Sequence, residues 1–193
     1  MAQHDIPASM LKESLDETLE AISFCIEFKK TDEKWGEFKT GGCLGFPGSV
    51  LLFSIIDTIG SYFRKNAEME VLIDNKKVKI NAEGWEHFKI LNSKYFNQNL
   101  SEIFIKKLYS SFRSKLTHNS ILGDGTLMVV SNERLKGYKG ESFSFIQGVD
   151  ENQKVIYIVS LTELYHLCQK AVSEFKNDID DVVPTSKSGR QFT

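Results

Sequence analysis

Apolar residues in the first third of the chain recur at spacings of three and four, the pattern of helices that bury one face. The first such stretch predicts a helix over residues 9–29, with a buried stripe of Leu11, Leu15, Leu19, Ile22 and Ile26. The second predicts a helix over residues 47–65. Apolar side chains surround most of this second helix, so we expect it to be the central helix of the fold.

A later stretch has the most regular spacing. Its apolar stripe follows at intervals of four residues, at Phe104, Leu108, Phe112 and Leu116. Asn99 and Glu102 have the spacing of a capping box, which places the start of this helix, and the helix is predicted to end near His118. A second capping box at Ser160 and Glu163 opens a last helix to about residue 176. A short helix is expected over residues 85–91.

Short β-prone runs lie between these helices. Residues 69–80 alternate around a polar centre and predict a small hairpin with its turn at Asp74 and Asn75. Residues 127–130, 142–146 and 155–159 predict two or three short antiparallel strands. The expected fold is therefore mainly α, a helical bundle with a small β-hairpin or short antiparallel strands inserted before the last helix.

The length of the chain limits the number of domains, and its net charge limits how it could bind nucleic acid. A chain of 193 residues suits one domain, which we place at residues 1–177, with a flexible C-terminal tail at 178–193. The formal net charge of −2 excludes a strongly basic body, so any contact with nucleic acid needs a local patch.

The cysteines and the apolar run point to a soluble, cytoplasmic protein. The three cysteines, Cys25, Cys43 and Cys168, have no zinc-ligand or redox-motif spacing and are expected to be reduced thiols. The most apolar run, residues 46–63, contains Pro47 and Asp57 and is too interrupted for a membrane span. The N-terminus does not have the pattern of a signal peptide.

Two kinds of site are disfavoured. The glycine-rich residues 41–49 have no lysine after the last glycine, which a phosphate-binding P-loop requires, and are expected to be a flexible helix entry. The histidines His4, His87, His118 and His166 are dispersed, without a metal-binding pair among them. We therefore expect no metal and no cofactor.

Arg113 and His118 are the chemically suggestive residues of the chain. Arginine is always charged and can fork onto phosphate oxygens, whereas histidine titrates near neutral pH. Together they suit phosphodiester cleavage, with the histidine moving a proton and the arginine stabilising charge on phosphorus. On an ideal helix the two side chains point about 140° apart. They meet only if the helix ends or distorts between them, or if a second copy of the chain completes the site.

Residues 108–119, Leu-Tyr-Ser-Ser-Phe-Arg-Ser-Lys-Leu-Thr-His-Asn, resemble the signature helix of the HEPN superfamily. The shared features are the R-x4-H spacing, an aromatic residue before the arginine, a leucine two residues before the histidine and a small polar residue after it. HEPN domains are helical bundles that usually dimerise, and active members cut RNA without a metal. The resemblance implies a homodimeric endoribonuclease of toxin–antitoxin or antiviral type, with Arg113 and His118 as catalytic residues.

The resemblance leaves a second interpretation open. Ser114 stands where many active members have Asn, Asp or His, and Ser120 stands where one toxin branch has tyrosine. A non-catalytic HEPN-like module that dimerises or binds a partner protein is therefore the alternative, and a helical protein unrelated to HEPN is a third interpretation.

Further residues are candidates for supporting roles. Asp57 sits in an apolar helix, where a carboxylate needs a partner, and either orients Arg113 or His118 or makes a purely structural contact. Ser114 and Asn119 flank the motif. Three basic residues of the same helix form either an RNA-binding phosphate track or a solvated helix face: Lys106, Lys107 and Lys115.

Overall fold

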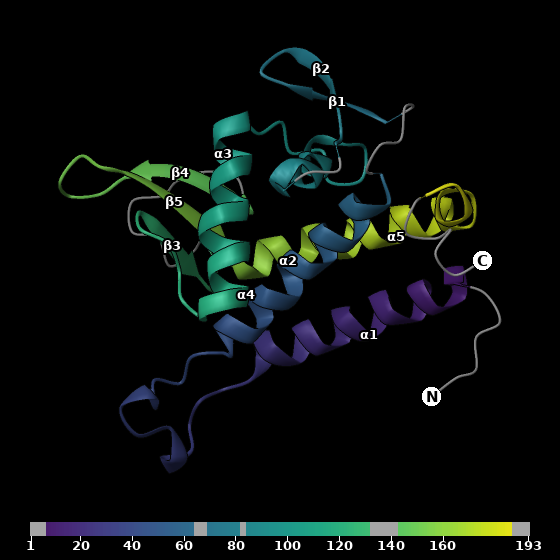
Figure 1. Ribbon diagram of the computed structural model, residues 1–193. Helices are drawn as coiled ribbons and strands as arrows, with labels where there is room; N and C mark the ends of the chain where they lie inside the picture. The colour runs from purple at the N-terminus through teal and green to yellow at the C-terminus, as the bar shows by residue number, and fades with distance from the viewer. Residues whose placement is uncertain (1–6, 64–68, 82–83, 132–142, 187–193) are drawn as a thin grey trace.

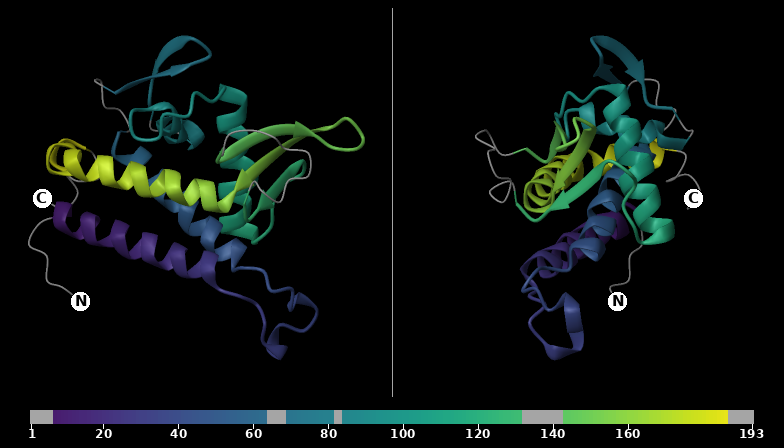
Figure 2. Two further views of the ribbon diagram at one scale, coloured as in Figure 1. Left: turned by 180° about the vertical axis from the view of Figure 1, so that it is seen from behind. Right: turned by 90° about the vertical axis from the view of Figure 1, so that its left-hand side faces the viewer.

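Three long helices pack side by side and form the body of the protein (Figures 1 and 2). They are α1 (Pro7–Glu27), α2 (Gly45–Tyr62) and α5 (Leu161–Thr185). The computed structural model describes residues 7–63, 69–81, 84–131 and 143–186. The mainly α fold expected from the sequence is confirmed, and the predicted apolar stripe of α1 turns inward at Leu11, Leu15 and Ile22.

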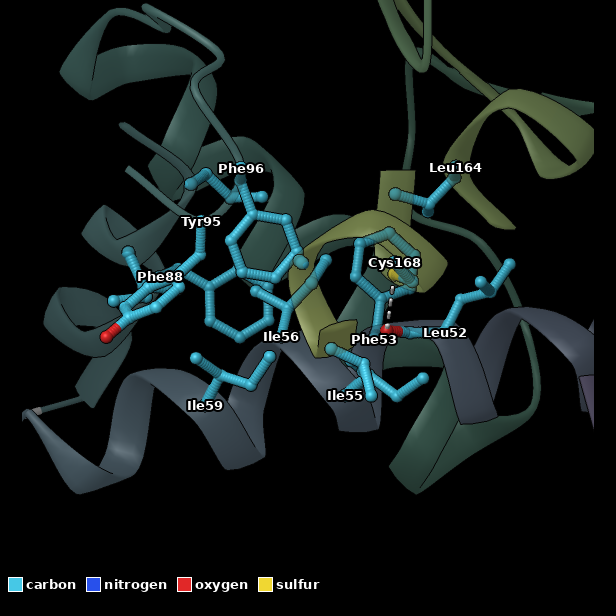
Figure 3. Packing of buried hydrophobic residues seen from close by; sticks show 14 of the residues in the cluster. Leu52, Phe53, Ile55, Ile56, Ile59, Phe88, Tyr95, Phe96, Leu164 and Cys168 are labelled. Carbon is cyan, nitrogen blue, oxygen red and sulfur yellow. Dashed lines mark hydrogen bonds between the residues drawn. The ribbon is translucent and has the colours of Figure 1, made fainter. Parts of the chain in front are cut away.

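The centre of the core lies on α2. Leu52, Ile56 and Ile59 of this helix are completely buried. Figure 3 shows Ile56 and Ile59 beside the aromatic residues Phe88, Tyr95 and Phe96, and Leu52 beside Cys168 of α5. The prediction that α2 is the central helix is confirmed, because apolar residues around its circumference are covered from several sides.

A protruding connection and a hairpin extend from opposite sides of this body (Figure 1). The connection between α1 and α2 contains a short 3₁₀ segment, η1 (Glu33–Phe38). The predicted hairpin is confirmed as β1 (Glu70–Ile73) and β2 (Lys76–Lys79). Asp74 and Asn75 both have positive φ, which a two-residue hairpin turn of type I′ requires.

The helix that carries Arg113 differs from the predicted single α-helix. It begins with α3 (Glu102–Lys107), continues as a π-helical segment, η3 (Leu108–Ser114), and ends with α4 (Lys115–Asn119). Its N-cap is Ser101, whose hydroxyl accepts a hydrogen bond from the Phe104 amide, so the prediction of an Asn99 cap was wrong. The predicted end near His118 is confirmed, since Ser120 adopts a left-handed conformation that stops the helix.

The π segment is compatible with the spacing of the apolar stripe. An α-helix has 3.6 residues per turn, so a stripe at intervals of four would rotate by about 40° at every step. Wider π turns remove much of that rotation. All four stripe residues are buried: Phe104, Leu108, Phe112 and Leu116.

A three-stranded sheet packs beside this helix, in the order β3–β5–β4. Its strands are β3 (Thr126–Val129), β4 (Phe145–Val149) and β5 (Val155–Ser160). β4 and β5 form the expected antiparallel pair, but β3 runs parallel to β5. Of the two or three antiparallel strands predicted, two are therefore confirmed, and an antiparallel third strand is wrong. The reason is topological: β4 crosses over to the far edge, which leaves β3 and β5 running in the same direction.

The last helix is longer than predicted. α5 begins after Ser160, as the capping pattern indicates, but continues to Thr185, and its residues Ile179 and Val183 are buried in the core. Residues 178–186 are therefore not the flexible tail expected from the sequence, because their apolar side chains pack on the body. Residues 187–193, the rest of that predicted tail, lie outside the described part of the chain. Among the described helices, none has the length and apolar character needed to cross a membrane.

The short segment between β2 and α3 completes the core. The short helix predicted over 85–91 is present as a 3₁₀ segment, η2 (Gly84–Asn92). η2 packs on α2 and buries Phe88, Ile90 and Leu91. This packing brings η2, α2 and η3 together at one place, where the polar residues described next meet.

Candidate functional site

Arg113 and Asp57 form a half-buried ion pair between η3 and α2. The Arg113 Nε and Nη2 groups both donate to Asp57 Oδ2, at 3.1 and 2.6 Å. The side chains are 25% and 23% exposed, respectively. Asp57 thus lies at the edge of the apolar helix. Of the two functional contacts that the sequence suggested for it, the contact with Arg113 is present. Among the described residues, no hydrogen bond or ion pair joins Asp57 to His118.

The second oxygen of Asp57 is also engaged. His87 of η2 contacts Asp57 Oδ1 through its Nε2 atom, and only 1% of the His87 surface is exposed. A carboxylate accepts, so the shared hydrogen lies on His87 Nε2. Burial acts to raise the pKa of the Asp57 carboxyl, but the hydrogen bonds and charges of His87 and Arg113 outweigh it, and the pKa is lowered.

Tyr109 connects the two partners of Asp57. Its ring stands at 87° to the His87 ring, with the ring centroids 5.7 Å apart. The Arg113 guanidinium carbon lies 5.5 Å from the centroid of the same Tyr109 ring, within cation–π range. Asp57, His87, Tyr109 and Arg113, which we call the Asp57 cluster, therefore come from three separate segments of the chain.

His118 belongs to α4 and is not hydrogen-bonded to this cluster in the described ranges. It is exposed in the last turn of α4, and among the described residues no hydrogen bond or ion pair joins it to Arg113. Asn119 is exposed beside it, and Ser114 is half-buried. The structure therefore joins Asp57 to Arg113 by hydrogen bonds, whereas no such bond joins Arg113 to His118 among the described residues.

The candidate RNA-binding lysines differ in how free they are. Lys106 pairs with Glu102 at 2.6 Å and lies over the Trp85 ring. Lys107 donates to the Asp124 carbonyl at 2.7 Å. Lys115 is exposed and makes no ion pair with a described residue. Two of the three lysines thus already bind protein groups, so Lys115 is the one of these three that a single chain leaves open to a phosphate.

Sequence reasoning missed His87 and Tyr109. A signal for His87 was present, because this histidine directly precedes the buried apolar residues of η2, Phe88, Ile90 and Leu91. Buried polar side chains are nearly always hydrogen-bonded. Asp57, the single carboxylate in the apolar run of α2, was the matching partner. Nothing in the sequence indicated the ring contacts of Tyr109.

No metal site is evident in the described ranges, which contain no group of three or more His, Cys, Asp or Glu side chains arranged to hold an ion. Comparisons of the chain with protein-family models, with curated proteins and with solved structures found no match. The site must therefore be interpreted from its own geometry and from the motif in the sequence.

Proposed function

We propose that this protein is a HEPN-like domain that works as a homodimer and cleaves RNA without a metal, with Arg113 on the scissile phosphate and His118 in proton transfer. The proposal rests on one observation: the protein binds the Arg113 guanidinium along one edge only. Asp57 takes the Nε and Nη2 groups, and Nη1 has no partner among the described residues. A pre-oriented guanidinium with an open edge suits a phosphate oxygen.

The chemistry follows from these residue types. His118 of one subunit removes the proton from a ribose 2′-hydroxyl, and the 2′-oxygen attacks the phosphorus. The bond to the 5′-oxygen breaks, and the leaving oxygen takes a proton from the second His118. The products are a 2′,3′-cyclic phosphate and a 5′-hydroxyl end. Arg113 stabilises the negative charge that builds on the phosphate oxygens.

Two features favour a dimer for this reaction. No hydrogen bond or ion pair joins the exposed His118 to Arg113 in the described part of one chain, which favours a second copy as the source of the complementary group. Asp57 also offsets the charge of Arg113 within each chain. Two copies bring two arginines and two exposed Lys115 side chains to one RNA, which strengthens phosphate binding.

The test is an RNA cleavage assay of the pure protein in EDTA, with Arg113→Ala, His118→Ala and His166→Ala variants. His166 is exposed on α5 and serves as the matched histidine control. We expect cleavage with cyclic phosphate ends in the unchanged protein and in His166→Ala, and its loss in the other two. Intact RNA with the unchanged dimer, or full activity of both Arg113→Ala and His118→Ala, contradicts the catalytic proposal.

The second candidate is a non-catalytic HEPN-like module that dimerises or binds a partner protein. The engagement of Lys106 and Lys107 and the pairing of Arg113 with Asp57 favour it, because they reduce the charge available to RNA. In that case Arg113→Ala and His118→Ala dimerise and bind as the unchanged protein does. Size-exclusion chromatography with light scattering measures this directly.

A further inference from the structure

The buried His87 holds the opposite side of the carboxylate that binds Arg113. We propose that His87 is a positioning residue, which acts through Asp57 to keep the Arg113 guanidinium open toward a phosphate. This inference rests on the proposed function and adds to it a residue outside the R-x4-H motif. At 1% exposure His87 cannot reach a substrate, so its effect on RNA passes through Asp57.

Each oxygen of the Asp57 carboxylate has its own partner. Asp57 Oδ1 accepts from His87, and Oδ2 accepts from both Arg113 nitrogens. A carboxylate that is free to turn forms bidentate pairs with arginine through both oxygens. Because His87 occupies Oδ1, Arg113 is held by one oxygen only. Without His87, the carboxylate can turn and engage further guanidinium groups, including the Nη1 edge needed by a phosphate.

A close approach of the η2 backbone to α2 at Gly60 brings His87 to Asp57. Gly60 lies three residues after Asp57 on α2, and a Cβ at position 60 would be 2.3 Å from the His87 carbonyl oxygen. Only glycine permits that approach without a shift of η2. The same Cβ would lie 3.2 Å from an Ile90 side-chain carbon. Gly60 thus sets the distance between η2 and α2, and with it the contact between His87 and Asp57.

The aromatic contacts restrict the remaining motion. The Tyr109 ring packs edge-to-face with the His87 ring and also lies within cation–π range of the Arg113 guanidinium. Phe88 packs against both rings, with centroids 5.2 Å from His87 and 5.2 Å from Tyr109. The imidazole is therefore fixed in orientation by its neighbours, as a residue that positions another must be.

The test compares His87→Gln with His87→Leu. A glutamine amide can donate near the position of Nε2, whereas leucine cannot donate. The chain contains only four arginines, so the Nε–Hε signal of Arg113 can be assigned by its loss in Arg113→Lys. We expect this NMR signal to be retained in His87→Gln and shifted or broadened in His87→Leu. In RNA cleavage, kcat should fall about 10- to 100-fold in His87→Leu and recover in His87→Gln.

An unchanged Arg113 signal in a folded His87→Leu protein overturns the positioning role. If His87→Leu does not fold, Gly60→Ala provides the second route, since it keeps His87 but displaces its backbone. An unchanged Arg113 signal in Gly60→Ala then overturns the inference. If the Arg113 signal responds as expected but no variant, including the unchanged protein, cleaves RNA, the proposed function fails while the positioning role stands.

Discussion

The Gly123 amide donates a 2.8 Å hydrogen bond to the carbonyl oxygen of Ser111, in the middle of the π-helical segment. Gly123 also lies so close that a Cβ at this position would be 2.6 Å from the Ser111 Cβ. The chain after α4 therefore folds back onto η3 and provides a hydrogen-bond donor from outside the helix. Arg113 lies two residues after Ser111, so this contact stabilises the part of the helix that presents the guanidinium.

Gly123→Ala is expected to destabilise the protein by about 1–3 kcal/mol, because the added methyl group collides with Ser111 and must displace backbone. Urea unfolding measures the change. Gly148→Ala is the matched control, since the nearest atom to a Cβ there is 3.8 Å away, an ordinary contact. Equal stability of the two variants would show that the return of the chain onto η3 is looser than the structure indicates.

Asp57→Asn is expected to remove part of the acid sensitivity of the fold. The folded-state pKa of Asp57 is lowered, so its contribution to stability is present above the ordinary carboxyl pKa of about 3.9. That contribution is lost as the pH falls through the lower folded value. Unfolding free energies measured between neutral pH and about pH 3 should converge for Asp57→Asn and the unchanged protein at the acid end. A constant difference across this range would contradict the lowered pKa.

Arg113→Ala and His118→Ala should differ in stability even where both abolish cleavage. Removing Arg113 leaves Asp57 half-buried with His87 alone, at a cost of about 1.5–3 kcal/mol. His118 is exposed, and its replacement should change stability by less than about 0.5 kcal/mol. Thermal and urea unfolding test this directly. A His118→Ala protein as destabilised as Arg113→Ala would mean that His118 has a structural contact in the folded chain.

Tyr95 should stay protonated well above its usual range. Burial raises the pKa of the Tyr95 hydroxyl, and the hydrogen bond it donates to Asp178 at 2.6 Å raises it further. Its contribution to stability is therefore present below the ordinary pKa of about 10 and is lost as the pH rises through the higher folded value. Tyr95→Phe should therefore leave the ultraviolet titration of tyrosinate in the folded protein unchanged up to about pH 11. Loss of a tyrosinate step in this range would show that Tyr95 ionises there and would contradict the raised pKa.

The helix that contains Arg113 and His118 shows which features a local sequence pattern can predict. The four-residue stripe correctly predicted a helix that buries Phe104, Leu108, Phe112 and Leu116 and ends beside His118. The same stripe did not reveal the π turns, because a single sequence does not show whether the backbone or the packing will absorb the rotation of the stripe. An angle of about 140° between Arg113 and His118 holds only for an ideal helix, and this segment is not ideal.

Local periodicity and composition were enough to predict a mainly α chain, with α2 at its centre and Arg113 near the end of a helix. These features depend on neighbours a few residues away, so the sequence contains them directly. The contacts of Asp57 were decided by tertiary structure alone. Its partners lie 30 and 56 residues away, at His87 and Arg113. Only the packing of η2 and η3 on α2, closed at Gly60, brings those side chains to one carboxylate.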